Sequence, residues 1–229
     1  RMGKAPKEYI AAVDHLSCES CNKTARNPQT NKVGPPKPYE FNHEVGIDVF
    51  ELPDFTGKPH LFLNQLCQGT NFQIVAHLLQ GAGVPPSSLC ARTFMMTWVS
   101  WAGWPRKVVS DRGLHNRGRF SRMLGAHGIS IRNTGLESPE QLGRTERHGD
   151  MWKNIAKRVI HAQQITGAEQ MSLLSFELNQ VLNDNMRKSG FSASQWVLGK
   201  FPRRPGSCMD EDEFADLGVI SERLRSEEH

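Results

Sequence analysis

The sequence predicts an α/β fold in which helices cover a mixed β-sheet, and three observations support this class. Apolar segments rich in β-branched and aromatic residues follow one another at hairpin spacing between residues 44 and 79. Strand-like and helix-like segments then alternate between residues 89 and 133. Helical periodicity dominates from residue 139 to residue 199. Strands followed by alternating strands and helices are typical of a sheet with helical layers.

The predicted strands come first along the chain. They cover residues 44–52 (EVGIDVFEL), 60–68 (HLFLNQLCQ) and 71–79 (NFQIVAHLL). Their branched and aromatic side chains suit a pleated, half-buried surface. Gly69-Thr70 is the candidate turn between the second and third of these strands.

The rest of the chain alternates and then becomes helical. Proline and serine at 85–88 mark the start of an apolar helix, and Gly103 marks its end. The further predicted strands are 106–111 (RKVVSD) and 129–133 (ISIRN), and the further predicted helices are 116–128, 139–164, 169–188 and 192–199.

Two residue types are assigned to the interior on their spacing or chemistry. Trp98, Trp101 and Trp104 recur every third residue, which is far more typical of a helix core than of a base-stacking platform. Cys67, Cys90 and Cys208 are expected to be buried or incidental thiols, because free cysteine behaves as a small apolar residue.

The composition limits the class of protein. The chain has 229 residues, 38% of them hydrophobic and 23% charged, which excludes wholesale disorder. It has no apolar run long enough for a membrane span and no apolar core of a signal peptide near its start. Five cysteines without regular spacing argue against a secreted disulfide framework. We therefore expect an intracellular protein, nuclear or cytoplasmic.

The net charge of +4 conceals an uneven distribution. Residues 210–229 carry eight acids and two arginines, so the rest of the chain has 26 basic against 16 acidic residues. Within 103–160 twelve lysines and arginines face five acids. A basic body suits a polyanion, because lysine and arginine contacts to phosphate release condensed counterions. Ordinary charge fluctuation on a solvated surface remains the alternative reading of the charge alone.

Three acidic residues are candidates for chemistry. Asp48 lies inside an apolar strand, where an unpaired carboxylate is costly, so it either faces solvent at a strand end, is paired, or coordinates a cation. Asp111 closes a strand and is either a turn cap or a functional acid. Glu146 lies on the long helix over 139–164, where a lone glutamate is usually a surface residue.

The helix that carries Glu146 is amphipathic. One side of it is an apolar stripe formed by Met151, Trp152, Ile155 and Val159. The opposite side carries the charged residues Glu146, Asp150, Lys153 and Lys157. A carboxylate followed by lysines suits a metal ligand next to phosphate clamps, and a solvated face with i,i+4 pairs would look similar. Three carboxylates from two strands and a helix are the ligands that a Mg²⁺ phosphoryl-transfer site needs.

The order Asp48, Asp111 and Glu146, with steps of 63 and 35 positions, resembles the Asp-Asp-Glu core of retroviral and retrotransposon integrases. The flanking segments resemble the family too: YEFNHEVGIDVFEL is similar to its first strand, and WPRKVVSDRG to the strand of its second acid. SPEQLGRTER (138–147) is similar to the run into its catalytic helix, and SGFSASQWVLGKFPRRP (189–205) to the end of its core. The resemblance covers roughly residues 10–205. The chain departs from the family pattern at Asn116, where an aromatic residue is usual, and at Gly149, where asparagine is common.

The resemblance implies an RNase H-like fold, an α/β mixed sheet of about five strands flanked by helices. It implies that Asp48, Asp111 and Glu146 hold Mg²⁺ or Mn²⁺. The implied activity is that of a DNA integrase, a polynucleotidyl transferase that trims the 3′ ends of an element's DNA and joins them to target DNA. Lys153 carries over as a DNA contact, with Arg147 and Lys157 added on charge. The implied partners are double-stranded DNA, both element ends and target, and further copies of the chain, with no membrane.

The resemblance also suggests a domain organisation. Residues 1–39 are expected to be a remnant of an integrase zinc-binding module plus a linker, 40–200 the catalytic core, and 201–229 an acidic, poorly ordered tail. Cys18 and Cys21 resemble the second half of a His-His-Cys-Cys zinc module. Tetrahedral Zn²⁺ needs four ligands, and His15 supplies at most one more, so the expected zinc site is incomplete.

Two further readings stay open at this point. One is a catalytically decayed or domesticated module that keeps the fold and binds nucleic acid without chemistry. The other is a different RNase H-like enzyme, such as a cut-and-paste transposase or a nuclease.

Overall fold

The computed structural model describes residues 40–110, 113, 118–133, 139–185, 187–188 and 190–200. The expected zinc-module remnant over 1–39 and the acidic tail over 201–229 lie outside the described residues, as do Asp111, Asn116 and Cys208. The fold below is therefore that of the predicted core region.

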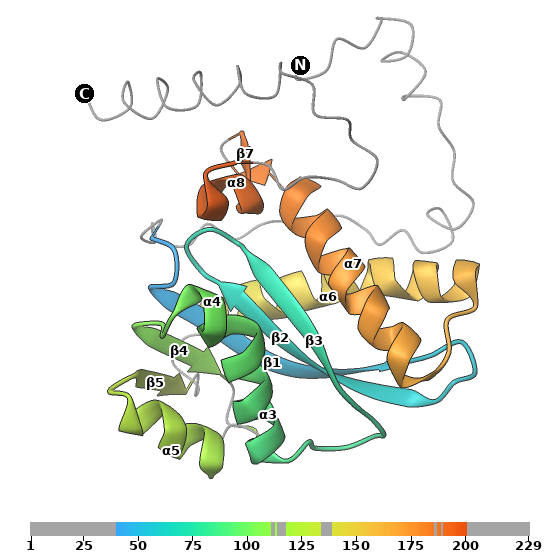
Figure 1. Ribbon diagram of the computed structural model, residues 1–229, viewed down its shortest axis with the longest axis horizontal. Helices are drawn as coiled ribbons and strands as arrows, with labels where there is room; N and C mark the ends of the chain where they lie inside the picture. Colours follow the sequence, from blue (N-terminus) through green and yellow to red (C-terminus); the bar gives the residue numbers. More distant parts are fainter. Residues whose placement is uncertain are drawn as a thin grey trace, which may run out of the picture. The chain divides into compact units, whose positions relative to one another are not determined.

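Five strands form one mixed sheet in the order β3-β2-β1-β4-β5 (Figure 1). The first three strands pair antiparallel, as their hairpin spacing predicts, and β4 and β5 pair parallel with β1 and with each other. Each predicted strand is present within two residues of its expected bounds. The strands are β1 (Glu44–Pro53), β2 (Pro59–Cys67), β3 (Gln73–Gln80), β4 (Lys107–Ser110) and β5 (Ser130–Asn133).

The helices lie where the hydrophobic periodicity places them. The apolar helix is a continuous run with a π turn in its middle: α3 (Ser87–Phe94), η1 (Met95–Val99) and α4 (Ser100–Ala102). The others are α5 (Arg119–Ala126), α6 (Pro139–Gln163), α7 (Gly167–Asn185) and α8 (Ala193–Leu198).

The prediction of a helix through residue 188 is wrong at its end. Helix α7 ends at Asn185, and two short strands, β6 (Arg187–Lys188) and β7 (Phe191–Ser192), pair antiparallel after it. Gly190 between them has a φ of +88°, a conformation that glycine adopts without steric cost. Two-residue strands leave no periodicity in the sequence, so only the tertiary structure reveals this hairpin.

Alternate side chains of β1 enter two separate cores. Val45 and Ile47 are fully buried with residues of α3 and α5 on one face of the sheet. Phe50 and Leu52 pack on the other face with Trp152 and other residues of α6 and α7. The period of two along a strand therefore assigns the even-numbered positions of β1 to the α6 face.

The three tryptophans differ in their surroundings. Trp98 is fully buried and donates its indole N–H to Asn42 Oδ1 at 2.8 Å, as expected of helix core. Trp101 is 43% exposed and lies against Phe41, and Trp104 follows the helix end and stacks on His127. The core assignment thus holds fully for Trp98 and in part for Trp104, which is half-buried against the same core beyond the helix end, whereas Trp101 is exposed.

Cys67 and Cys90 are buried free thiols, as predicted, and burial raises the pKa of Cys90 to about 11. Within the described part of the chain, no helix combines the length and the apolar content that crossing a bilayer requires.

Candidate active site

Asp48 lies in the middle of β1 on the face that α6 covers. Its cross-strand partner is Asn64 of β2, and directly opposite residues in an antiparallel pair point to the same face. Asp48 is partly exposed, whereas Asn64 is fully buried. The apolar strand therefore carries a polar pair at one level, and the carboxylate of that pair keeps access to solvent.

Buried hydrogen bonds fix helix α6 at this level of the sheet. Asn64 donates its side-chain N–H to the Thr145 carbonyl at 3.1 Å, and Gln68 donates to the Thr145 hydroxyl at 2.8 Å. Arg144 adds a bond of 2.6 Å to the Gln68 carbonyl. Glu146 follows Thr145 directly and is exposed. Asn64 thus joins the strand position of Asp48 to the residue before Glu146.

Two glycines allow this close approach. A Cβ atom at Gly46 would overlap the hydroxyl of Thr145, and one at Gly149 would lie 3.1 Å from the Asn64 amide nitrogen. Gly149, a departure from the integrase pattern, is buried against β1 and β2, so the absence of a side chain there leaves room for close contact with the sheet. The turn of α6 between Thr145 and Gly149 consequently faces the stretch of β1 from Gly46 to Phe50, which contains Asp48.

Asp111 lies outside the described residues, so its position is not part of this geometry. Strand β4 ends at Ser110, which pairs in parallel with Ile47, the residue before Asp48. Asp48 and Asp111 are therefore the residues that follow a directly paired couple, Ile47 and Ser110, on neighbouring parallel strands. Among the described residues, no cluster of three metal-binding side chains is present. The structure brings together the elements of two predicted acids, and the third stays a prediction.

The predicted DNA-binding cations lie on α6. Arg147 and Lys157 are exposed, as a phosphate contact requires. Lys153 contacts Asp150 Oδ1 at 2.7 Å and lies over the ring of Phe50, with its ammonium nitrogen 5.3 Å from the ring centre. Asp150 is thus paired with a lysine one turn away. This ion pair competes with the DNA contact predicted for Lys153.

The donor set of the site suits a hard divalent cation. Asp48 and Glu146 offer carboxylate oxygens, and both remain open to solvent. Mg²⁺ takes one or two carboxylates and completes its shell with water and substrate phosphate, so carboxylates that solvent can reach suit it. The buried amide and hydroxyl groups of Asn64, Gln68 and Thr145 hold α6 against the sheet at this level.

A second ionisable cluster lies just past the far end of β1. Asp54 accepts hydrogen bonds from the backbone N–H groups of Thr56, Lys58 and Gly167, which hold its pKa well below the usual range although burial alone would raise it. His60 bridges Asp54 at 3.4 Å and His77 at 2.9 Å. Burial, and then the charge of the neighbouring histidine, lower the pKa of His77 to about 4. Asp54 is six positions from Asp48, roughly 20 Å along the strand, so this cluster is a structural element apart from the site.

Sequence reasoning missed the residues that position the site. Asn64 and Gln65 interrupt an otherwise apolar strand, and both are fully buried and hydrogen-bonded. A buried polar residue inside an apolar strand needs a hydrogen-bond partner, so the pattern LNQL indicates that Asn64 and Gln65 bind polar groups of another element. It did not identify the partner, which in the case of Asn64 lies 81 positions away.

Comparison with solved structures places this fold among retroviral integrase cores. The HTLV-2 integrase catalytic core domain in complex with magnesium, in a dimeric form, is similar with a TM-score of 0.55 and 14% identity over 69% of this chain and 97% of that one. A simian T-cell lymphotropic virus intasome in complex with PP2A regulatory subunit B56 gamma gives 0.61 and 13% over 91% and 74%. The catalytic core domain of BIV integrase gives 0.54 and 11% over 69% and 95%.

No protein-family model and no curated protein matches the sequence. At these identities the comparisons establish the fold, an RNase H-like mixed sheet of the integrase catalytic core type, as the sequence predicted.

Proposed function

We propose that the chain is an integrase core of retrotransposon type, which uses Asp48, Asp111 and Glu146 to process DNA 3′ ends and to join them to target DNA. The observation that carries this proposal is the Asn64–Thr145 hydrogen bond of 3.1 Å, which sets the cross-strand partner of Asp48 against the residue before Glu146. The integrase-type fold supports it independently.

A divalent metal is part of the proposal, and two of the similar structures are integrase cores in complex with magnesium. Bound at these carboxylates, Mg²⁺ or Mn²⁺ would supply Lewis-acid activation of the attacking oxygen and stabilisation of the leaving one. Asp48 and Glu146 would hold the ion from strand β1 and helix α6, and buried hydrogen bonds from Asn64 and Gln68 keep α6 in place against the sheet. Asp111 enters on the sequence resemblance alone.

The proposed joining step needs no external energy source. The DNA 3′-oxygen attacks a target phosphorus, a new P–O bond forms, and the P–O3′ bond of the target strand breaks. The proton of the attacking hydroxyl is lost to solvent, and the leaving 3′-oxygen takes one up. One phosphodiester is thus exchanged for another, so positioning and charge stabilisation are what the protein must contribute.

The charge of α6 fits a DNA substrate. Between residues 144 and 158 the helix carries five basic and two acidic side chains. Arg147 and Lys157 are exposed on it. Assembly on two DNA ends would need several copies of the chain, and the similar cores include dimeric and trimeric forms and an intasome.

The metal part is tested by Mn²⁺ binding, followed by electron paramagnetic resonance. Asp48→Asn and Glu146→Gln are each expected to weaken Mn²⁺ binding by at least tenfold. Glu51→Gln is the matched control, because Glu51 is exposed on the same strand but, at an odd position, belongs to the opposite face. Equal loss in the control, or none in the site variants, would refute the metal assignment.

The activity is tested by joining labelled duplexes with randomised terminal base pairs to a supercoiled plasmid in Mg²⁺ or Mn²⁺. Random ends avoid the need to know the element's own sequence. Joined products are expected from the unaltered chain, and Asp111→Asn should abolish them. Joining that survives this substitution contradicts the proposed site. Cleavage of an RNA–DNA hybrid without joining would instead assign the chain to another RNase H-like activity.

A second candidate is a nucleic-acid-binding module without catalysis. The Lys153–Asp150 contact at 2.7 Å favours it, because it occupies the cation that the resemblance assigns to DNA. This candidate predicts salt-dependent DNA binding together with no Mn²⁺ binding at Asp48 and Glu146. The same two assays therefore decide between the candidates.

A further inference from the structure

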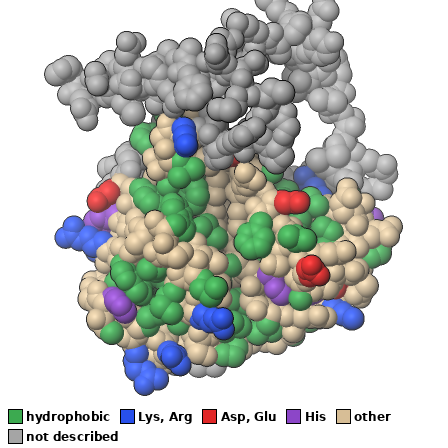
Figure 2. Space-filling view, in the orientation of Figure 1, with side chains coloured by type: hydrophobic (Ala, Val, Ile, Leu, Met, Phe, Trp, Pro, Cys, Tyr) green, Lys and Arg blue, Asp and Glu red, His purple; other side chains and the backbone are tan. Residues whose placement is uncertain are grey.

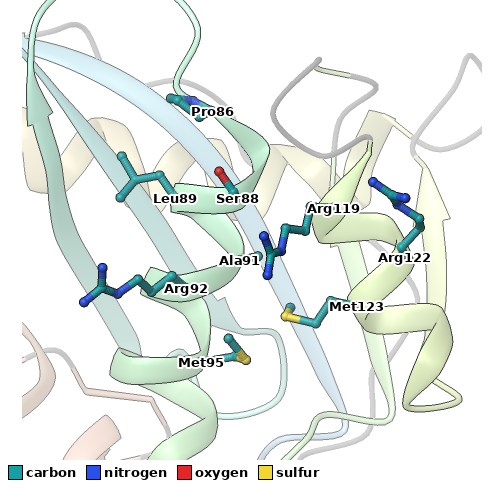
Figure 3. A pocket seen from close by; sticks show the side chains of 9 residues that line it. All are labelled: Pro86, Ser88, Leu89, Ala91, Arg92, Met95, Arg119, Arg122 and Met123. Atoms are coloured by element: carbon teal, nitrogen blue, oxygen red, sulfur yellow. The ribbon is translucent and has the colours of Figure 1, made fainter.

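A pocket of about 850 Å³ lies between α3 and α5, on the face of the sheet opposite α6. Leu89, Met95 and Met123 give it an apolar lining. In Figure 3, Met95 and Met123 approach each other from the two sides, and Arg119 extends from α5 toward α3. The pocket is separate from the proposed active site, because β1 presents Ile47, not Asp48, to this side.

Contacts between α3 and α5 hold the two walls of the pocket in place. Ser87 Oγ accepts a hydrogen bond of 2.9 Å from the backbone N–H of Phe120, which joins the first turns of α3 and α5. Beneath it Phe94 and Phe120 pack edge to face, with ring centres 5.7 Å apart, and both are buried. A ligand would therefore meet a surface that is largely formed in advance.

The pocket is strongly basic. Arg92, Arg119 and Arg122 line it and all three are exposed, and none of the described residues that line it is acidic. Among the residues that the structure describes, no carboxylate lies within 4.0 Å of these guanidinium groups. Figure 2 shows Lys and Arg side chains with hydrophobic ones, and no acidic ones, at the end where Figure 1 places α3 and α5. An anionic segment with apolar side chains would match this surface in both respects.

The chain itself contains such a segment. Residues 210–220 (DEDEFADLGVI) hold five acids and no base, and Phe214, Leu217 and Ile220 are spaced among and after the acids. Every other stretch of eleven residues that combines five acids with no base overlaps this one. The acids match the arginines of the pocket, and the apolar side chains match its methionines and leucine.

We propose that the acidic segment 210–220 binds in the pocket between α3 and α5, with its carboxylates on Arg92, Arg119 and Arg122. Charge-assisted contacts to arginine are the stronger class of hydrogen bond, and apolar burial adds to them. The ten residue steps from Lys200 to Asp210 span at most about 35 Å. The occupant is the segment 210–220 in either case. It comes from the same chain if this span is long enough to reach the pocket, and from a second copy if it is not.

Disulfide trapping in the full chain tests this proposal. Cys18, Cys21 and Cys208 are replaced by serine, and the buried Cys67 and Cys90 stay. Met95→Cys, at a position 39% exposed, is combined with Leu217→Cys under mild oxidation. The matched control combines the same tail cysteine with Phe55→Cys, at a position 46% exposed after β1. The pocket pair is expected to form its disulfide at least tenfold faster than the control pair.

Charge reversal tests the arginines in the same assay. Arg92→Glu with Arg119→Glu should slow trapping about tenfold, and lysines in place of Asp210 and Glu211 should restore it. Arg106→Glu, at an exposed position outside the pocket, should leave the rate unchanged. Urea unfolding of each variant shows that the fold is retained.

The outcomes separate the possible occupants. Monomer-sized products at all concentrations indicate the chain's own tail, and dimer-sized products that increase with concentration indicate a second copy; both support the proposal. A pocket rate within twofold of the control rate overturns it, as does a rate that charge reversal leaves unchanged. If duplex DNA binding falls on Arg92→Glu with Arg119→Glu while trapping does not occur, the pocket binds nucleic acid and the proposal is wrong.

Discussion

Replacing Gly46 by alanine tests the contact that brings α6 to β1. An added Cβ would overlap the Thr145 hydroxyl and lie 2.6 Å from Gln68 Nε2. Gly46 is not among the residues of positive φ, so alanine brings no backbone strain of its own. The whole effect therefore arises from the helix–strand contact, one residue from Glu146.

Two costs contribute to the expected loss. Overpacking a well-filled interior costs about 1–3 kcal/mol. The Gln68–Thr145 hydrogen bond of 2.8 Å would break and leave buried polar groups without partners, which costs about 1–3 kcal/mol. Because part of the overlap is relieved by movement of the helix, we expect a total loss of about 2–4 kcal/mol. With a urea m-value of about 2 kcal/mol/M, the unfolding midpoint should fall by about 1–2 M.

Urea unfolding of a double-mutant cycle with Thr145→Ala checks the origin of this loss. Removing the hydroxyl removes the overlapping atom, so Gly46→Ala should cost at least about 1 kcal/mol less in that background. Gly143→Ala is the matched control on α6. Its Cβ would meet nothing within 4 Å, and it should stabilise the protein by about 0.5–1 kcal/mol. Equal costs of Gly46→Ala in both backgrounds would refute the reasoning.

Two further predictions concern charge. Asp150→Asn removes the partner of Lys153 and one repulsive charge, so affinity for duplex DNA at low salt should rise a few-fold. The control Glu169→Gln, at an exposed position near the start of α7, should change this affinity little. Fluorescence anisotropy measures the affinity of both variants. The stability change should stay below about 1 kcal/mol, because the pair is at the surface. The second concerns His77, whose pKa of about 4 in the folded protein is below its ordinary value of 6.5. Between these two pH values the unfolded chain binds a proton that the folded protein does not, so the free energy of unfolding should rise with pH from about 4 to 6.5. The contribution is about 1–2 kcal/mol, reduced from a limit of about 3 because the ring keeps contact with solvent. It should be absent from the urea-unfolding pH profile of His77→Asn, and a profile unchanged by the substitution contradicts the assignment.

Local signals in the sequence were sufficient for most elements. Segments rich in β-branched and aromatic residues at hairpin spacing identified β1 to β3, and glycine and proline marked the ends of the helical run that begins at α3. The error at the end of α7 came from a segment too short to carry a period. The amphipathic pattern of α6 also placed Trp152 in the core and Glu146 on the surface, as observed.

The sequence by itself determined which strand and which helix carry Asp48 and Glu146, and that a basic body accompanies an acidic tail. These properties depend on residues close together in the chain, where a strand or helix period is visible. Only the tertiary structure decided that Asn64 ties β2 to Thr145, that Lys153 is paired with Asp150 over Phe50, and that three arginines of two helices line one pocket. Contacts of this kind depend on how closely packed elements approach one another, and no local pattern of side chains records that distance.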